Sequence, residues 1–207
     1  MKKGLFITFE GADGCGKTTQ RDLAAKYLEE KGLEVLKTRE PGGAPLGVKL
    51  REILLHHEGF VSPACESFLF LADRAQHVET VILPAIAAGK IVLCDRFIDS
   101  TAAYQGYGKG IDLDRINYLN ELATNGKKPD LTLVFDVDTD VAQSRVGKEK
   151  DRMESEGIEF HKRVRAGYLE IANLEPQRIR VINANPPIET VFEAVKLVID
   201  EIICCTD

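Results

Sequence analysis

Short apolar runs alternate along this chain with longer segments in which apolar residues recur at helical spacing. The strand-like runs cover residues 5–10, 34–40, 91–96, 131–136 and 178–184. The first, third and fourth are almost continuously apolar, which is typical of strands covered on both faces of a parallel sheet. The alternation therefore predicts an α/β protein with a single doubly wound domain over residues 1–207.

Two helices are predicted most clearly by their apolar stripes. After the first run, one helix face is marked by Leu23, Ala24, Tyr27 and Leu28, and we expect this helix to end at Gly32. Near the C-terminus, two prolines precede a helix whose stripe is formed by Ile188, Val191, Phe192, Val195, Ile199 and Ile202. Such stripes are typical of helices that pack one face against a core.

A third helical segment, residues 64–88, carries a second pattern beside its core spacing. The core spacing is followed by Phe68, Leu71, Ala75, Val78 and Ile82. Phe70 lies about 200° around the helix from Phe68, and Arg74 follows Phe70 by one turn. On an exposed stripe, this ring and guanidinium could stack on a nucleotide base and donate to its carbonyl group. Ordinary packing with a surface arginine would give the same spacing, so both interpretations stay open.

The most informative segment follows the first apolar run. Its residues match the pattern G-x-x-x-x-G-K-[ST] in full, as Gly11, Ala12, Asp13, Gly14, Cys15, Gly16, Lys17 and Thr18, followed by Thr19. Backbone N–H groups in such a loop can surround a phosphate, the next helix adds its positive end, and Lys17 supplies a mobile charge. The Thr18 hydroxyl is a candidate ligand for Mg²⁺. An ordinary glycine-rich turn is the alternative, but the flanking strand and helix favour a nucleoside triphosphate site.

Charged residues stand where the predicted strands end. The first run ends at Glu10, the second ends in Arg39 and Glu40, the third ends in Asp95 and Arg96, and the fourth ends at Asp136. Because ligands of doubly wound proteins bind beyond the carboxyl ends of the strands, we expect these groups to converge beside the phosphate loop. Arg39 and Arg96 suit a phosphate group, and Asp95 can hold Mg²⁺ directly or through water. A solvated arginine and a structural Asp–Arg pair are the alternatives.

Two further segments could contribute to the same site. If residues 100–106 are helical, Thr101, Tyr104 and Gln105 share a face and offer hydroxyl and amide groups. Residues 144–154 are charged, contain a glycine and have no apolar stripe. Most segments of this kind are solvated surface. In a phosphoryl-transfer enzyme, such a segment could instead be a lid that adds an arginine and excludes water.

Composition limits the function without naming it. Apolar residues make up 44% of the 207 residues and charged residues 29%, which excludes disordered and fibrous classes. The chain has 27 basic and 33 acidic residues, and the net charge of −6 argues against a surface that coats nucleic acid. No apolar run reaches the length of a membrane span, and residues 1–4 lead directly into the first strand. We therefore expect no membrane partner and no signal peptide.

The five cysteines show neither metal-ligand spacing nor an even disulfide framework, which predicts a reducing, cytoplasmic compartment. Cys15 lies in the phosphate loop, near Lys17 and the start of a helix, and both would favour its thiolate. The simpler interpretation, which we favour, is a small residue that fills a tight turn.

In their order along the chain, these motifs resemble the signature of thymidylate kinases of bacterial type. The matching segments are residues 10–19, 38–43, 95–97, 100–106 and 129–132. The resemblance covers nearly the whole chain and is far more specific than the phosphate loop alone. It implies the P-loop kinase fold, with three layers and a five-stranded parallel sheet, and the use of ATP and Mg²⁺. It further implies conversion of dTMP to dTDP and a homodimer packed through helices.

The resemblance also implies roles for the matching residues. ATP would be held by residues 11–19, with Lys17 and Thr18 at the phosphates and the metal. The residues around the acceptor phosphate and the metal would be Asp13, Arg39, Asp95 and Arg96. The residues around thymine and the deoxyribose would be Phe70, Arg74, Ser100, Thr101, Tyr104 and Gln105. Among these, Phe70 would stack on the base, Arg74 would donate to its O4, and Tyr104 would lie against the sugar.

The chain departs from part of the family in its phosphate loop. Some family members carry an arginine there, at the position of Gly14 in this chain. Others supply the cation from the lid, which here covers about residues 145–156 and offers Arg145, Lys148, Lys150 and Arg152. We favour Arg145 or Arg152, because a planar guanidinium suits the spread charge of a transferring phosphoryl group better than an ammonium group does.

Three alternative functions share the phosphate loop. A deoxynucleoside kinase is the nearest, but its acceptor is a 5′-hydroxyl group, whereas Arg39 and Arg96 favour a phosphate acceptor. A GTP-dependent switch would need N-K-x-D after a strand, a spacing that residues 125–130 lack. The third is a nucleotide-binding module without catalytic activity.

Overall fold

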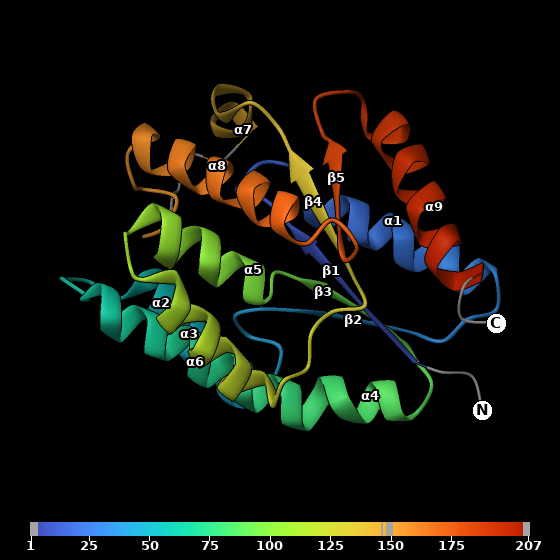
Figure 1. Cartoon of the computed structure of the whole chain (residues 1–207), viewed down its shortest axis with the longest axis horizontal. Helices are drawn as coiled ribbons and strands as arrows, with labels where there is room; N and C mark the ends of the chain where they lie inside the picture. Colours follow the sequence, from blue (N-terminus) through green and yellow to red (C-terminus); the bar gives the residue numbers. More distant parts are fainter. Residues whose placement is uncertain (1–3, 146, 148–150, 205–207) are drawn as a thin grey trace.

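Residues 4–145, 147 and 151–204 are described by a computed structural model. Its centre is a sheet of five parallel strands in the order β2-β3-β1-β4-β5 (Figure 1). The strands are β1 (Leu5–Glu10), β2 (Val35–Arg39), β3 (Ile91–Asp95), β4 (Leu131–Asp136) and β5 (Ile179–Asn183). The structure confirms the fold class, and it confirms each predicted strand to within one residue at either end.

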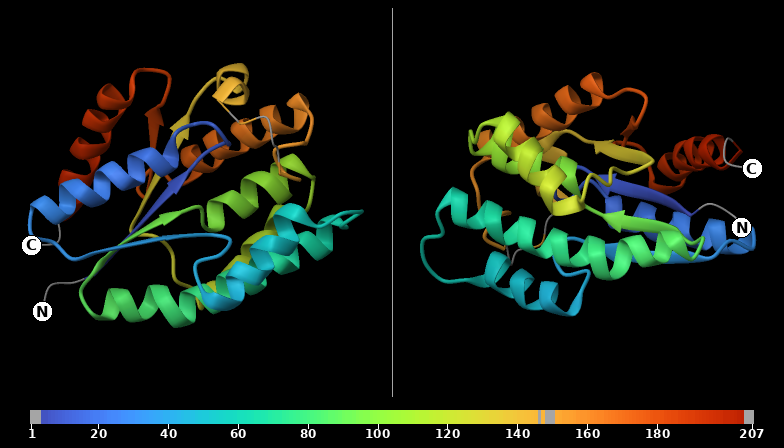
Figure 2. Two further views of the ribbon diagram at one scale, coloured as in Figure 1. Left: turned by 180° about the vertical axis from the view of Figure 1, so that it is seen from behind. Right: turned by 60° about the horizontal axis from the view of Figure 1, so that its bottom comes forward.

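Helices cover both faces of the sheet, so the molecule has three layers (Figures 1 and 2). One face is covered by α1 (Lys17–Glu30) and α9 (Ile188–Cys204). The other is covered by the π-helical turns η1 (Val78–Ile82) and η2 (Ala102–Gly108) together with α4 (Leu83–Ala87), α5 (Ile98–Thr101) and α8 (Ile158–Leu174). No described helix is long and apolar enough to cross a lipid bilayer.

The remaining helices lie at the margins of these layers. The helices α2 (Pro45–His56), α3 (Pro63–His77) and α6 (Leu113–Thr124) form a group beside η2, and α2 and α6 both flank α3. In Figure 1, α7 (Thr139–Arg145) lies at the arrowhead of β4, beyond the carboxyl ends of the strands.

Alternation along the strands explains their continuous apolar character. Leu5, Ile7 and Phe9 of β1 pack in the core beneath α1 and α9. Phe6, between them in sequence, points to the opposite face and packs with residues of η1 and α4. Because successive side chains of a strand point to opposite faces, a strand covered on both faces needs apolar residues throughout.

The two helices predicted most clearly are confirmed. Helix α1 ends at Glu30, and Gly32 follows it with a positive φ of 77°, close to the predicted end. In α9, Val191, Val195 and Ile199 are buried as expected. Ile188 differs, since 52% of its surface is exposed at the start of the helix.

The core spacing predicted for residues 64–88 is only partly correct. Leu71, Val78 and Ile82 are buried, but Ala75 is exposed, as is 60% of the surface of Phe68. The buried face of α3 instead carries the polar residues Glu66, Ser67, Asp73, Arg74 and His77. Except for Ser67, which bonds to Pro63 of the same helix, their partners come from distant segments. Apolar spacing within the helix therefore could not identify this face.

Candidate functional site

The phosphate loop joins β1 to α1 and needs glycine at specific places. Gly11, Gly14 and Gly16 have φ angles of 139°, 81° and 88°, a region that side-chain-bearing residues rarely adopt. A Cβ atom on Gly14 would lie 2.1 Å from the carbonyl oxygen of Ala142, and one on Gly11 would lie 2.7 Å from that of Phe135. The chain therefore cannot carry an arginine at position 14 without moving α7.

Lys17 and Thr18 open α1 directly after this loop. The Lys17 side chain is buried, and its Nζ lies 3.3 Å from the carbonyl oxygen of Ala12 and 3.6 Å from Oδ1 of Asp13. These contacts are long, so the ammonium group has room to turn toward a bound phosphate. Thr18 donates its hydroxyl hydrogen to Asp95, at the end of the neighbouring strand β3.

Thr18 and Asp95 form a pair of oxygen ligands that fits Mg²⁺. This ion is usually held by one or two protein ligands and completed by water and substrate phosphates. Among the described residues there is no cluster of three or more His, Cys, Asp or Glu side chains that could hold a metal. The arrangement thus fits a metal that binds together with a nucleotide.

Cys15 packs inside the loop. Only 2% of its surface is exposed, and burial raises the pKa of its thiol despite the nearby charge of Lys17. Both observations favour the simpler interpretation, a small residue that fills a tight turn.

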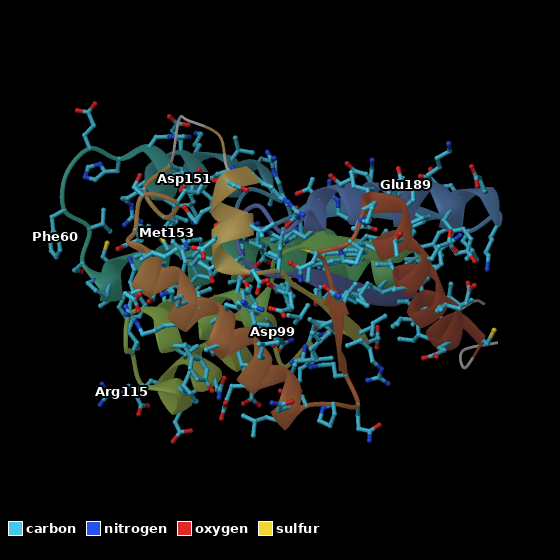
Figure 3. The ribbon with its side chains drawn as sticks, turned by 90° about the horizontal axis from the view of Figure 1, so that it is seen from above. Phe60, Asp99, Arg115, Asp151, Met153 and Glu189 are labelled. Atoms are coloured by element: carbon cyan, nitrogen blue, oxygen red, sulfur yellow. The ribbon has the colours of Figure 1, made fainter. Side chains whose placement is uncertain are left out.

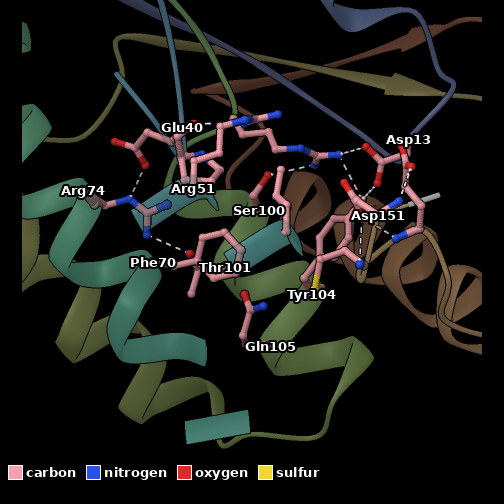
Figure 4. A pocket seen from close by; sticks show the side chains of 15 residues that line it. Asp13, Glu40, Arg51, Phe70, Arg74, Ser100, Thr101, Tyr104, Gln105 and Asp151 are labelled. Carbon is pink, nitrogen blue, oxygen red and sulfur yellow. Dashed lines mark hydrogen bonds and ion pairs between the residues drawn. The ribbon is translucent and has the colours of Figure 1, made fainter. Parts of the chain in front are cut away.

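A cavity of about 150 Å³ opens beyond the carboxyl ends of β1, β2 and β3 (Figure 4). Of the residues predicted to bind substrate, eight line it: Asp13, Phe70, Arg74, Arg96, Ser100, Thr101, Tyr104 and Gln105. They come from the phosphate loop, from α3 and from the segment after β3. The tertiary structure thus brings together residues separated by up to 92 positions in the sequence, and we call this space the acceptor cavity.

Arg96 links the acceptor cavity to the phosphate loop. Its backbone has a φ of 68°, which is unusual for a residue other than glycine. Its guanidinium group lies 2.5 Å from Oδ1 of Asp13 and donates to the carbonyl oxygen of Gly11 at 3.0 Å and to the Tyr104 hydroxyl at 3.1 Å. Burial alone would raise the pKa of Asp13, but Arg96 and Lys17 hold it well below its usual range.

Glu10, at the end of β1, is fully buried and bonds to the segment that follows Arg96. It accepts hydrogen bonds from the backbone N–H of Phe97 and from the Ser100 hydroxyl, each at 2.6 Å, and from the Tyr168 hydroxyl at 3.1 Å. Burial, together with the nearby charge of Asp99, raises the pKa of Glu10 to about 7. The bond to Phe97 fixes the turn that carries Arg96.

Arg74 is buried, not on an exposed stripe as predicted. Only 2% of its surface is exposed, yet it lines the cavity together with Phe70, as the helical spacing indicated. Its hydrogen-bond partners are Oε2 of Glu40, the Thr101 hydroxyl, Oδ1 of Asn120 and the carbonyl oxygen of Phe97. A guanidinium has five N–H groups, and these four bonds leave one N–H on Nη2 without a partner among the described residues.

Helix α3 also holds the turn that follows β2. The Glu40–Pro41 peptide bond, which the sequence left undecided, is cis. His77 lies between Oε1 of Glu40, at 2.9 Å, and the Thr38 hydroxyl, at 2.7 Å, while Asp73 accepts from the backbone N–H of Gly42 at 3.0 Å. A Cβ atom on Gly43 would lie 2.2 Å from the imidazole, so glycine is required at this close approach.

The arginines near this turn form a cationic cluster. Arg39 is exposed, does not line the cavity, and makes no hydrogen bond with the described residues. Arg51, on α2, does line the cavity and donates to the carbonyl oxygen of Pro41 at 3.0 Å. Burial and the nearby charges of Arg39 and Arg96 lower the pKa of Arg51. Like charges held this close together favour the binding of an anion between them.

Arg51 and Asn120 were missed by the sequence analysis. Each is a single polar residue on a helix, and neither belongs to a motif or follows a strand. Glu40, which directly follows β2 and was expected at the site with the other residues at strand ends, does line the cavity. Asp136, which does end a strand, does not join the site, because Arg165 donates to it at 2.6 and 3.0 Å.

A second and larger space, of about 650 Å³, lies on the other side of the loop. It is lined by residues 13–20 on one side and by Ala184, Pro186, Pro187, Ile188 and Val191 on the other, and we call it the donor groove. Gly11 and Ala12 do not line it. Asp13 and Glu154 line both the donor groove and the acceptor cavity, so the two spaces meet at these residues.

The two arginines predicted to supply a catalytic cation lie in different places. Arg145, at the end of α7, lines the donor groove and donates to the carbonyl oxygen of Ala184 at 3.3 Å. Arg152 lines neither space, donates to the carbonyl oxygen of Leu54 and pairs with Glu66 at 2.6 Å. Lys148 and Lys150 lie outside the described residues.

The segment around Arg152 is not the uniformly charged surface that its composition indicated. Met153 is buried against Phe160 and Tyr168, and it lines the acceptor cavity together with Asp151 and Glu154. Figure 3 shows Asp151 and Met153 on the side of α2 and α3, away from Glu189 at the start of α9. This part of the predicted lid therefore borders the acceptor cavity.

Comparison with known proteins bears on the identity of this site. The family profile described as thymidylate kinase matches residues 9–195. A thymidylate kinase of Synechococcus sp. (strain JA-2-3B'a(2-13)) is 54% identical over 180 residues, covering 87% of this chain and 86% of the relative. One from Clostridium novyi (strain NT) is 45% identical over 201 residues, covering 95% and 98%.

A solved structure has the same architecture. The crystal structure of thymidylate kinase from Ehrlichia chaffeensis aligns with a TM-score of 0.81 at 40% identity, covering 95% of this chain and 98% of that one. Sequence and fold thus agree over nearly the full length of the chain. The chain therefore belongs to the thymidylate kinase family, the ATP:dTMP phosphotransferases that convert dTMP to dTDP.

Proposed function

We propose that the two nucleotides bind end to end across Asp13, with ATP in the donor groove and dTMP in the acceptor cavity. The observation that carries this proposal is that Asp13 lines both spaces. It lies between Lys17, at 3.6 Å, and Arg96, at 2.5 Å. A cation on each side of one carboxylate would keep both phosphate chains close to the point of transfer.

The chemistry requires alignment more than proton transfer. The acceptor atom is an oxygen of an ionised phosphate, so no strong general base is needed. The rate must come from holding two anions in line and neutralising the charge that repels them. We assign the donor phosphates to residues 11–19 with Lys17, and the acceptor phosphate to Arg39, Arg96 and, in addition, Arg51.

Mg²⁺ would be held by Thr18 and Asp95 together with the phosphates of ATP. When bound, it would neutralise charge on the transferring group. The contact between the two side chains supports this assignment. Replacing Asp95 by Asn should raise the Mg²⁺ concentration needed for half-maximal rate, and an unchanged requirement would contradict the assignment.

The base and sugar of dTMP would lie among the side chains of α3, α5 and η2. We assign stacking on thymine to Phe70 and donation to its O4 to the remaining N–H of Arg74. The Ser100, Thr101 and Gln105 side chains would border the base. Tyr104, whose hydroxyl donates to Asp13 at 2.8 Å, would lie against the deoxyribose and disfavour a 2′-hydroxyl group.

The lid arginines would have separate roles. Arg145 lines the donor groove, so it is our candidate for the cation that acts on the transferring phosphoryl group. Arg152 is already paired with Glu66 beside the acceptor cavity. Arg152 is therefore the weaker of the two candidates.

One experiment tests the assignment of the acceptor. ADP release is measured with ATP, Mg²⁺ and dTMP, dUMP, thymidine or dGMP in parallel. We expect turnover with dTMP far above that with thymidine, because Arg39, Arg51 and Arg96 require a phosphate on the acceptor. Faster turnover of thymidine would mean a deoxynucleoside kinase, and no ADP release with dTMP would overturn the assignment.

A homodimer is the expected assembly, and its surface would be formed by α3 and α6. Phe68 on α3 is 60% exposed, and Tyr118 and Leu122 on the neighbouring α6 are 67% and 69% exposed. Large apolar side chains grouped on adjacent helices favour association. Light scattering should give twice the chain mass, and Phe68→Glu should shift it toward one chain. A single chain mass for the unchanged protein would contradict this proposal.

A cytoplasmic location is supported by the cysteines. Cys15, Cys65, Cys94 and Cys204 are all free thiols. Unpaired cysteines are typical of a reducing compartment. Secretion of the full-length protein by its native cell would contradict this location.

A further inference from the structure

A buried carboxylate lies behind the acceptor cavity. Glu66 is in the first half of α3 and has no exposed surface. It does not line the cavity, but donors from two other segments point to it. They are Nε2 of Gln105 at 3.0 Å, Nζ of Lys109 at 2.9 Å and Nη1 of Arg152 at 2.6 Å. Of these, Gln105 lines the cavity, so Glu66 acts on the cavity through it.

The contact determines which end of the Gln105 amide faces the cavity. Burial raises the pKa of Glu66, but hydrogen bonds from Lys109 and Gln105 and the charge of Arg152 outweigh it, so the carboxyl group stays ionised. An ionised carboxylate only accepts hydrogen bonds, so only the NH₂ end of the amide can face it. The oxygen Oε1 of Gln105 then faces away from Glu66. Figure 4 shows this side chain below Thr101, with its amide group toward the other lining residues.

Gln105 and Arg74 together present a donor and an acceptor to a base. Arg74 has one N–H left on Nη2, and Oε1 of Gln105 accepts no hydrogen bond from the described residues. Thymine offers the complement, since its O4 accepts and its ring N3–H donates. Cytosine offers the reverse, because its N4 amino group donates and its N3 accepts.

We propose that Glu66 is a positioning residue that makes the site select thymine over cytosine, by turning the oxygen of Gln105 toward the base. Glu66 itself does not touch the nucleotide. The proposal rests on the assignment of dTMP to the acceptor cavity made above. It adds that the Glu66 carboxylate prevents the Gln105 amide from turning over.

The test replaces the carboxylate by an amide of the same shape. In Glu66→Gln the new amide can donate as well as accept, so Gln105 can present either end to the base. Affinities for dTMP and dCMP are measured by calorimetric titration in the absence of ATP. We expect the preference for dTMP over dCMP to fall by about tenfold or more, because an unpaired buried polar group is what rejects the wrong base.

Three further variants make the result specific. Glu79→Gln is the matched control, because Glu79 is exposed in η1, which continues α3, and we expect its preference to be unchanged. Glu66→Asp keeps an acceptor-only group and should retain the preference even where both affinities fall. If Glu66→Gln does not fold, Glu66→Gln/Lys109→Met removes one of the two cations that face this position and should show the same loss of preference.

Two outcomes separate this inference from the assignment beneath it. If Glu66→Gln weakens dTMP and dCMP equally, Glu66 has only a structural role and the inference is overturned. A fourth variant, Gln105→Leu, tests the assignment itself. If Gln105→Leu leaves the preference unchanged as well, the base does not bind beside Gln105 and the assignment of the cavity fails with it.

Discussion

The acceptor cavity and the donor groove meet at Asp13 but are built in different ways. The acceptor cavity measures about 150 Å³, and its central side chain, Arg74, bonds to residues of the β2 turn, α5 and α6. The donor groove measures about 650 Å³, and one of its sides is a single continuous segment, residues 13–20. Its two basic side chains, Lys17 and Arg145, each contact a carbonyl oxygen at 3.3 Å, and Lys17 also lies 3.6 Å from Oδ1 of Asp13.

This difference matches what each space is proposed to recognise. A phosphate chain is the same in every nucleoside triphosphate, so backbone N–H groups and a mobile cation are sufficient to hold it. A base is distinguished by the direction of its hydrogen bonds, and this requires donors and acceptors that cannot turn. The acceptor cavity obtains that rigidity from buried partners, as Arg74 does from Glu40 and Asn120.

The largest effect is expected on the donor side, from Lys17→Ala. This change removes the cation that we assign to the donor phosphates and should lower kcat about a thousandfold, as for other cations that stabilise this kind of transition state. Steady-state kinetics would measure it. The control is Lys26→Ala, an exposed lysine on the same helix that pairs with Glu30, which should leave kcat unchanged. Normal turnover by the Lys17→Ala variant would contradict the role assigned to Lys17 in the donor groove.

The next effect belongs to the acceptor side. Arg74→Lys keeps the charge but loses the planar group that bonds to Thr101, Asn120 and Phe97. We expect KM for dTMP to rise about a hundredfold, because a lysine cannot replace a guanidinium with several partners. KM for ATP should stay within about twofold, since the donor groove does not use Arg74. Arg163→Lys, whose guanidinium bonds only to backbone oxygens of Gly108 and Glu159, is the control.

The free energy of unfolding should depend on pH through Glu10, which bonds to the segment on the acceptor side of the site. Its pKa is raised from 4.5 to about 7, so the folded protein keeps this proton up to about pH 7, whereas the unfolded chain loses it near pH 4.5. The folded state therefore binds more protons within this window, and its stability falls as pH rises through it. The shift corresponds to about 3 kcal/mol in the free energy of unfolding.

Glu10→Gln cannot ionise and should lack this decline. Urea unfolding of both proteins at pH 5, 6, 7 and 8 would measure the difference between them. Asp73, whose pKa is raised to about 6, titrates in both proteins and cancels in the comparison. A difference that does not change between pH 5 and 7 would contradict the raised pKa of Glu10.

The smallest effect is expected for Arg145→Ala on the donor side. Its guanidinium lines the donor groove, so kcat/KM for ATP should fall at least about tenfold while KM for dTMP is kept. A loss in kcat near a thousandfold would identify Arg145 as the transition-state cation. A loss confined to KM for ATP would identify it as a binding residue. An unchanged kcat/KM for ATP would mean that Arg145 is not part of the site. The control is Arg180→Ala.

Sequence patterns predicted most of what is local in this protein. The continuous apolar runs of β1, β3 and β4 and the stripe of α9 follow from the periods of the strand and the helix. The phosphate loop could be identified because its glycines, Lys17 and Thr18 are consecutive. The signature motifs also placed Arg96 and Tyr104 near the same substrate, and both line the acceptor cavity.

The errors share one physical cause. Phe68 and Ala75 were predicted to face the core, but the buried face of α3 is polar, because its partners Glu40 and Gln105 come from other segments. Spacing likewise could not show that Arg152 pairs with Glu66, which lies on α3. A period shows which residues share a face, but it cannot show what that face will meet.

The sequence by itself determined the strands, the order of the motifs and the glycine-rich loop between β1 and α1, since each depends on residues that are neighbours along the chain. Tertiary structure alone decided that Arg74 is buried, that Arg51 joins the cationic cluster and that Glu66 lies behind Gln105. These contacts join segments far apart in the chain, and their direction depends on the packing of α2, α3 and η2 around one cavity.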